Sequence, residues 1–378
     1  MQKNKNLMRN ALKRKMILLL VSISVILTSC NKDDNNKIFS ELSKDIKNQD
    51  YVRVIERDIA NLPINTQVAI ALVHDGNVEY LGVTNDNNTL RGINNTESIF
   101  EIGSITKAFT GICFSKMIST NEVLLTETLQ EQFNFSVPTA GDITLEQLAN
   151  HTSGLPRLPT NIAEVVNFDM DNPYANYSYE NLQSYLQKDV NLNSESGTEY
   201  LYSNLGMGIL GYILAQKRNT TFEKLLQEII FKPLNMSNST SLLELVDTSK
   251  LVEPRDIKGN VVSHWDFSET TSAGGSIKSS VSDMSKFIIK NFDNDIVYNR
   301  AQKKTFDVGN NFYMGLGWNL YEVDGFKIHH HNGGTGGFSS MLMLDKEKQT
   351  GVLVLSNVEG FNNAIEELCN SLFIEINK

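Results

Sequence analysis

Ser104 and Lys107 are the first residues whose types and spacing could do chemistry. A spacing of three residues puts both side chains on one face of a helical turn. The hydroxyl can act as a nucleophile if the amine is partly desolvated, because desolvation lowers the amine pKa and lets it take the hydroxyl proton. A serine that caps a helix start has the same pattern, so the pair alone is weak support for catalysis.

A second candidate is the pair Tyr202 and Asn204. A phenol near cations can act as a general acid or base, and an amide can hold a substrate carbonyl or a lysine in place. Gly206, Gly208 and Gly211 follow, and such small residues suit a closely packed helix. The alternative for Tyr202 is an aromatic core residue at the start of that helix.

The third candidate is the segment His331-Asn332-Gly333-Gly334-Thr335. Glycines on a strand leave backbone exposed to a ligand, and a free strand N–H could complete an oxyanion hole. The run His329–His331 suggests a metal at first sight. Side chains alternate between the two faces of a strand, so the three rings cannot all point at one ion, and we expect no metal and no organic cofactor.

In this order, the three motifs resemble those of serine β-lactamases and penicillin-binding proteins. The similarity is to the class C β-lactamase-like branch, which also holds D-Ala-D-Ala carboxypeptidases, D-aminopeptidases and esterases. It runs from about residue 50 to the C-terminus. Residues 151–156, 273–275 and 315–318 look like structural landmarks of this branch, and we interpret them as loop and packing features.

The resemblance implies a role for each matching residue. Ser104 would be the nucleophile and Lys107 its activating partner. Tyr202 would be the general base and acid, and Asn204 would orient both the substrate and Lys107. The backbone N–H groups of Ser104 and Gly334 would form the oxyanion hole.

The third motif departs from the family pattern in one place. His331-Asn332-Gly333 stands where efficient class C β-lactamases have Lys-Thr-Gly. His331 therefore matches a cationic position, but a histidine is only partly charged near neutral pH. It would hold a substrate carboxylate less firmly than a lysine. Asn332, Gly333 and Thr335 would contact the substrate.

The hydropathy pattern and the resemblance together predict an α+β fold of the β-lactamase/transpeptidase type. An antiparallel sheet flanked by helices would form from residues of about 50–103 and 291–378, with a helical subdomain at about 104–290 and the site between them. Asp75-Gly76 between two apolar runs predicts a hairpin. We also expect a strand at 315–318.

The N-terminus has the composition of a targeting segment. Residues 1–29 combine six basic residues with a short apolar run and predict a signal peptide. Leu27–Cys30 resembles a bacterial lipobox, which implies lipidation of Cys30 and a bacterial envelope location, on the periplasmic face or the cell surface. Residues 30–49 would be a flexible tether and the start of the first helix. The alternative is a plain signal peptide or a short anchor.

The amino-acid composition bears on the domain organisation and on the classes of partner. Of 378 residues, 40% are hydrophobic and 21% charged, which suits one large domain or two subdomains that share a core. The formal charge of −10 disfavours a nucleic-acid partner. Cys113 and Cys369 are expected to be small buried side chains, although a disulfide between them stays possible.

The sequence therefore predicts a lipid-anchored serine hydrolase that works through an acyl-enzyme on Ser104. The substrate would be a D-amino-acid peptide, a β-lactam or a small ester, and the expected partners are this substrate and, through the lipid anchor on Cys30, a membrane. One alternative is a true class C-type β-lactamase. Another is a non-catalytic lipoprotein that binds a cell-wall peptide. If Tyr202 or Lys107 must lose its proton, activity should rise across a pKa below about 10.

Overall fold

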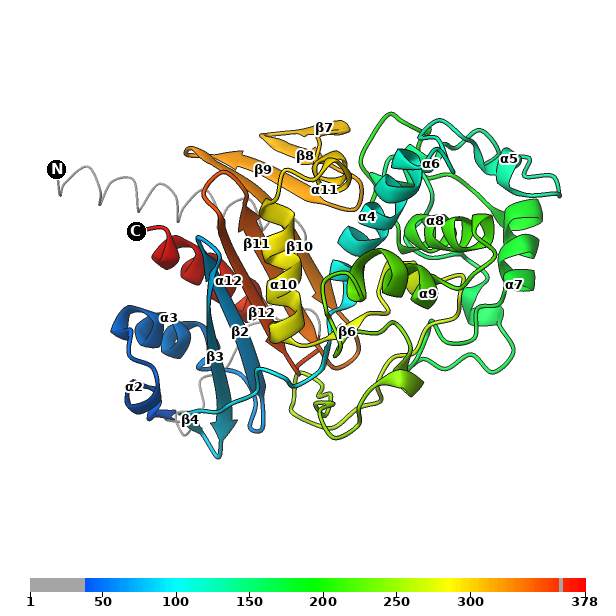
Figure 1. Ribbon diagram of the computed structural model, residues 1–378. Coiled ribbons are helices and arrows are strands. Elements are labelled where there is room, and N and C mark those ends of the chain that lie inside the picture. The colour runs from blue at the N-terminus through cyan, green and yellow to red at the C-terminus, as the bar shows by residue number, and fades with distance from the viewer. Residues whose placement is uncertain (1–37, 360–362) are drawn as a thin grey trace.

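The computed structural model describes residues 38–359 and 363–378 (Figure 1). The predicted signal peptide, Cys30 and the first part of the predicted tether lie outside these residues. No helix in the described ranges is long and apolar enough to cross a membrane.

A ten-stranded sheet forms one side of the molecule. Its order is β1-β4-β3-β2-β12-β11-β10-β9-β8-β7, and every pair is antiparallel except β1 with β4. The strands are β1 Phe39–Ser40, β2 Gln67–His74, β3 Asn77–Asp86, β4 Thr89–Gly92, β7 Phe306–Gly309, β8 Phe312–Met314, β9 Asn319–Val323, β10 Phe326–Gly334, β11 Ser339–Asp345 and β12 Thr350–Ser356. The pairing of β2 with β12 joins the N-terminal and C-terminal parts of the chain in one sheet.

The β2–β3 hairpin forms where the sequence predicts it. Asp75 and Gly76 have φ angles of 49° and 77°, the left-handed values that a tight hairpin turn requires. β2 is buried along almost its whole length because helices cover both faces of the sheet.

Helices form a layer on each face of the sheet (Figure 1). On one face, α3 (Gln49–Ile59) and α12 (Asn363–Ile376) pack together, and short α2 (Leu42–Asp45) precedes them. On the other face, α10 (Val281–Phe292) packs against β2 and β12. Residues 281–290 of α10 fall in the range 104–290 that is predicted as the helical part, but they pack with the sheet.

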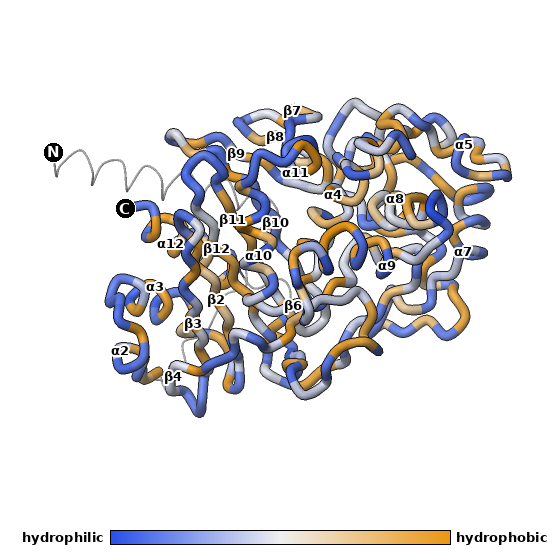
Figure 2. The backbone as a smooth tube through the Cα atoms, viewed as in Figure 1, coloured by the Kyte–Doolittle hydropathy of each residue, from blue (hydrophilic) through white to orange (hydrophobic). Residues whose placement is uncertain are grey.

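The rest of the chain forms the helical part beside the sheet. Its helices are α4 Thr106–Ser119, α5 Leu129–Gln132, α6 Leu145–Ala149, α7 Tyr179–Ser184, α8 Asn204–Lys217, α9 Phe222–Leu226 and α11 Ile296–Ala301. Most residues of α4 and α8 are buried, because both helices carry hydrophobic residues on all sides (Figure 2). A short ribbon of β5 (Phe100–Glu101) with β6 (Lys278–Ser279) connects this part to the sheet.

The expected strand at 315–318 is wrong. These residues form a bend between β8 and β9, and Gly317 has a φ of 70°. A Cβ on Gly317 would lie 2.0 Å from the carbonyl oxygen of Lys107, and one on Gly111 would lie 1.8 Å from that of Leu316. The glycines therefore serve the close packing of this bend against α4, which an extended strand would not allow.

Candidate active site

Ser104 lies at the junction between the sheet and the helical part. It belongs to the short 3-10 turn Gly103–Ile105 that runs directly into α4. Gly103 has a φ of 51°, and a Cβ there would lie 2.6 Å from the backbone nitrogen of Gly334. Glycine is thus required by both conformation and space, and its absence of a side chain lets the turn lie directly against β10.

Lys107 lies one helical turn after Ser104 and is fully buried. Its Nζ is 3.0 Å from Ser104 Oγ and donates to the carbonyl oxygen of Gly274 at 2.5 Å. Burial lowers the Lys107 pKa well below its usual value, and the positive charge of Arg157 lowers it further. An amine that loses its charge this readily can accept the proton of a hydroxyl in direct contact.

Tyr202 approaches Ser104 from the other side. Its O–H donates to Ser104 Oγ at 2.7 Å, and Lys107 Nζ lies 4.8 Å from the centre of its ring. Burial raises the Tyr202 pKa above its ordinary value, so the phenol keeps its proton at neutral pH. The two groups that contact Ser104 Oγ therefore differ: the Lys107 amine can accept a proton and the Tyr202 phenol can donate one.

Asn204 is the first residue of α8, whose start is capped by the Ser203 side chain. Its Nδ2 donates to the Tyr174 hydroxyl at 2.9 Å, and its Oδ1 is buried without a hydrogen-bond partner among the described residues. The resemblance implies that Asn204 orients Lys107, but Lys107 donates to Ser104 and Gly274 instead.

His331 lies on β10 with its ring 6.4 Å from the ring of Tyr202. It is buried, and its Nδ1 is 2.6 Å from the backbone oxygen of Asn332. Burial and the nearby Lys107 lower the His331 pKa to about 3. The ring is therefore uncharged at neutral pH, although the resemblance places it in a cationic position.

The edge of β10 is open next to Ser104. Its pairing with β9 ends at His330, while its pairing with β11 continues to Gly334. Thr335 N donates to Phe338 O across the β11 side, so the preceding N–H, that of Gly334, points to the opposite edge. That edge faces the Gly103–Ile105 turn, where Ser104 N, in the first turn of a helix, has no intrahelical acceptor. Both backbone donors of the predicted oxyanion hole thus lie at one place.

The remaining residues of the third motif have different surroundings. The Asn332 side chain is exposed and donates to Glu366 of α12, on the face of β10 away from His331. A Cβ on Gly333 would lie 2.1 Å from the backbone oxygen of Ile102, so its glycine serves close packing. Thr335 is buried, and its hydroxyl has no partner among the described residues.

Two features of the site come from segments that the sequence analysis treats as packing landmarks. The first is the Gly274 carbonyl, which receives the Lys107 amine. The second is His151, whose φ is 60° and whose ring centre lies 4.6 Å from that of Tyr202. The His151 Nδ1 accepts a hydrogen bond from Ser203 N at 3.2 Å, and burial lowers its pKa well below the usual value. His151 is thus a neutral support beneath Tyr202.

The glycines of α8 explain how Gly274 reaches Lys107. A Cβ on Gly211 would lie 2.0 Å from the Cβ of Ala273, and one on Gly208 would lie 2.4 Å from Thr270 O. The helix can therefore lie directly on the turn that carries Gly274. The glycine spacing after Tyr202 was a usable signal for this packing, as the sequence analysis notes.

The other residues singled out from the sequence lie outside the site. His329 packs edge-on against Trp318, whereas His330 stacks on Tyr321. No group of three or more His, Cys, Asp or Glu side chains within the described ranges could hold a metal ion. Cys113 and Cys369 are both buried free thiols, in α4 and α12.

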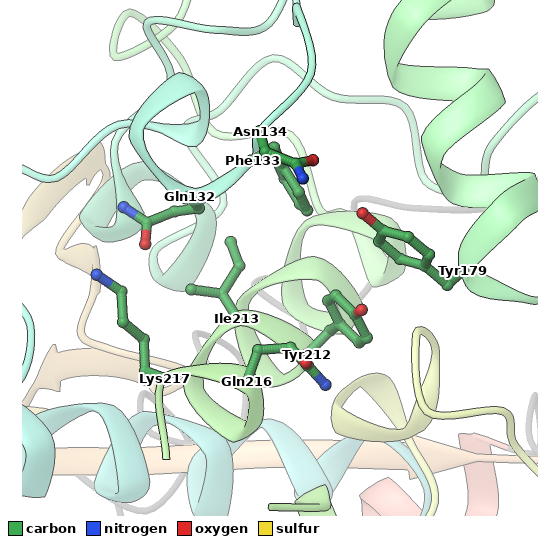
Figure 3. Close-up of a pocket in the computed structure, with 8 residues that line it drawn as sticks. All are labelled: Gln132, Phe133, Asn134, Tyr179, Tyr212, Ile213, Gln216 and Lys217. Atoms are coloured by element: carbon green, nitrogen blue, oxygen red, sulfur yellow. The ribbon is translucent and has the colours of Figure 1, made fainter. Parts of the chain in front are cut away.

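A separate pocket of about 370 Å³ lies in the helical part (Figure 3). Tyr179 of α7 and Tyr212 of α8 stack on one side of it, and Gln132 and Lys217 line another. Tyr212 and Lys217 lie in the C-terminal half of α8, whereas Asn204 is the first residue of that helix. The pocket is therefore separate from the groups around Ser104.

Known proteins resemble this chain in sequence and in fold. The model of the Beta-lactamase family matches residues 56–367. A β-lactamase of Escherichia coli K12 is 24% identical over 311 residues, which cover 69% of this chain and 76% of that protein. The protein flp of Staphylococcus aureus N315 is 25% identical over 68% of this chain, which spans about half (53%) of its length.

Solved structures show the same fold. A β-lactamase/D-alanine carboxypeptidase from Pseudomonas syringae superimposes with a TM-score of 0.71 at 17% identity, covering 85% of this chain and 98% of that one. A D-alanine carboxypeptidase from Burkholderia cenocepacia gives 0.68 at 17% identity, covering 86% and 99%. The large, mostly antiparallel sheet flanked by helices is the one that the sequence predicts. The chain belongs to the β-lactamase family and is a serine hydrolase of the β-lactamase fold.

Proposed function

We propose that the protein hydrolyses an amide or ester through an acyl-enzyme on Ser104. The observation that carries this proposal is the contact of Ser104 Oγ with both Lys107 Nζ and the Tyr202 hydroxyl, at 3.0 and 2.7 Å. One neighbour is an amine with a lowered pKa and the other a phenol with a raised pKa. Such a pair can remove a proton from one oxygen and deliver one to a leaving group.

The proposed cycle has two halves. Lys107 accepts the Ser104 proton as Oγ attacks the substrate carbonyl, and the N–H groups of Ser104 and Gly334 stabilise the oxyanion. Tyr202 gives its proton to the departing amine or alcohol, and the proton on Lys107 restores the phenol. In the second half, water attacks the acyl ester, its proton passes to the same pair, and Ser104 leaves with a proton. The free Asn204 Oδ1 would accept an N–H of the substrate.

The state of His331 bears on the substrate. An uncharged imidazole on β10 gives little hold on a carboxylate, whereas a lysine there would attract one. This counts against a dedicated β-lactamase that holds the substrate carboxylate at this position, and it leaves D-amino-acid peptides and small esters as the candidate substrates. A true class C-type β-lactamase is the second candidate, supported by the relatives that carry that name.

We further propose a place for this activity. The lipobox-like segment ending at Cys30 would anchor the protein to a bacterial envelope membrane, where peptidoglycan-derived peptides are available. A non-catalytic lipoprotein that binds such peptides is the alternative of another class. The complete set of Ser104, Lys107, Tyr202 and Asn204 argues against it, because a binding protein would have no use for a proton-transfer pair.

The first experiment is intact-mass measurement of residues 31–378 incubated with a penicillin, for the wild type and Ser104→Ala. A lasting adduct in the wild type alone would identify the nucleophile and slow deacylation. Penicillin loss without an adduct, again in the wild type alone, would favour the β-lactamase. If neither occurs, activated esters and D-amino-acid amides are the next substrates. Turnover of any of them by Ser104→Ala would remove Ser104 from the mechanism.

A further inference from the structure

Arg157 places an unpaired positive charge beside the candidate site. Its guanidinium carbon lies 5.0 Å from the centre of the Tyr202 ring, and the residue is exposed. Within the described ranges, its side chain forms no ion pair and donates no hydrogen bond. An arginine presents five N–H donors in a planar fork, which suits a carboxylate. The charge is therefore available to a ligand.

The backbone of Arg157 is fixed although its side chain is exposed. Its carbonyl oxygen accepts hydrogen bonds from the backbone nitrogens of Asn204 and Leu205, at 3.0 and 3.2 Å. The preceding carbonyl, that of Pro156, accepts from the Ser203 hydroxyl at 2.7 Å. These bonds tie the loop to the first turn of α8, directly after Tyr202. The guanidinium thus starts from a defined position next to the phenol.

Two other basic groups beside Ser104, His331 and Lys107, are shifted toward their uncharged forms. Burial lowers the pKa of His331 to about 3 and that of Lys107 well below its usual value. The positive charge of Arg157 itself contributes to lowering the pKa of Lys107, so its field reaches the reacting groups.

We propose that Arg157 forms an anion subsite for a carboxylate on the leaving group of the substrate. This inference rests on the proposed function, in which Tyr202 protonates the departing amine or alcohol. A group next to Tyr202 therefore faces the leaving group and not the acyl group. The substrates would be acyl compounds whose expelled amine or alcohol bears a free carboxylate, such as peptides cleaved before their C-terminal residue. The subsite lies on the helical side of the site, whereas the neutral His331 lies on the sheet side.

Three matched esters test the position of the carboxylate. They are phenyl benzoate, 3-carboxyphenyl benzoate with the charge on the leaving phenol, and monophenyl terephthalate with the charge on the acyl group. We would measure kcat/KM at a pH on the plateau of the pH profile, for the wild type, Arg157→Gln and Arg157→Lys. Arg53→Gln is the matched control, because it removes an exposed arginine from α3 on the other face of the sheet.

Arg157→Gln should lower kcat/KM for 3-carboxyphenyl benzoate about tenfold, mainly through KM, the size expected for one charge-assisted contact. The other two esters should change less than about twofold, and Arg157→Lys should retain most of the preference. Equal losses on all three esters, or a loss confined to monophenyl terephthalate, would overturn the subsite. No hydrolysis of any ester by the wild type would instead overturn the proposed function, and the subsite with it.

Discussion

Two buried lysines near Ser104 differ in what surrounds their amines. Lys107 Nζ contacts the hydroxyl of Ser104 and the carbonyl oxygen of Gly274, and neither group is charged. Lys278 lies opposite Glu101 in the β5–β6 ribbon, and Glu101 stands three residues before the nucleophile along the chain. Both amines are removed from water, so burial lowers the pKa of both.

The carboxylates decide how far each pKa moves. Glu101, Asp266 and Glu223 raise the pKa of Lys278 and so oppose the effect of burial, whereas Arg157 adds to it at Lys107. Burial alone therefore does not make a lysine into a base. A lysine becomes one here because its neighbours are neutral or positive, a condition that favours the uncharged amine.

The sharpest test of this comparison replaces each lysine by methionine, which has a similar length and no charge. Lys107→Met should lower kcat/KM for an activated ester by about 10³-fold, because it removes the proton acceptor. Lys278→Met should leave that rate within a few-fold but lower the free energy of unfolding by about 1 kcal/mol, since it removes the positive charge that Glu101, Asp266 and Glu223 favour. Comparable losses of activity in two folded variants, checked by circular dichroism, would erase the distinction.

Tyr202→Phe keeps the ring beside Lys107 and His151 and removes only the hydroxyl. We expect kcat to fall by about 10²-fold for an amide or alkyl ester, because the leaving group then lacks its proton donor. The fall should be smaller for a p-nitrophenyl ester, whose leaving group needs no proton. A loss that does not depend on the leaving group would contradict the donor role.

The pH dependence of kcat/KM tests whether Lys107 or Tyr202 changes its charge. The Lys107 amine is active when neutral, so kcat/KM for a neutral ester should rise with pH through its pKa, with a midpoint below the usual 10.5. The raised Tyr202 pKa means that the phenol keeps its proton over this range. Arg157→Gln should shift the rise to higher pH, because the charge that lowers the Lys107 pKa is gone. A flat profile from pH 5 to 9 would count against Lys107 as the base.

The smallest expected effect concerns the packing that places Gly274 on Lys107. Gly211→Ala would put a Cβ 2.0 Å from that of Ala273, which should cost about 1–3 kcal/mol and lower activity several-fold. Gly76→Ala is the control, because it strains a residue with a φ of 77° but meets open space. It should lower Tm slightly and leave activity unchanged. Equal activity in both variants would show that the α8 contact does not position the site.

The sequence predicts more of the site than of its support. Ser104 and Lys107 could be paired from their spacing, because three residues along a helix fix a shared face. His331 and Tyr202 could be identified only through the order of the motifs. Tyr174, whose hydroxyl accepts a hydrogen bond from Asn204, comes from the polar segment 161–177, which carries none of the three motifs. No local pattern indicates that this segment folds back onto α8.

The sequence by itself determined the local features. These are the hairpin at Asp75-Gly76, the helical turn from Ser104 to Lys107, and the glycines that permit close packing. These depend on spacing and backbone conformation, which neighbouring residues set. Only the tertiary structure determined which groups of the site are charged. Whether Lys107 and His331 are ionised depends on burial and on charges brought from distant parts of the chain, and the open edge of β10 exists only because β9 ends at its pairing with His330.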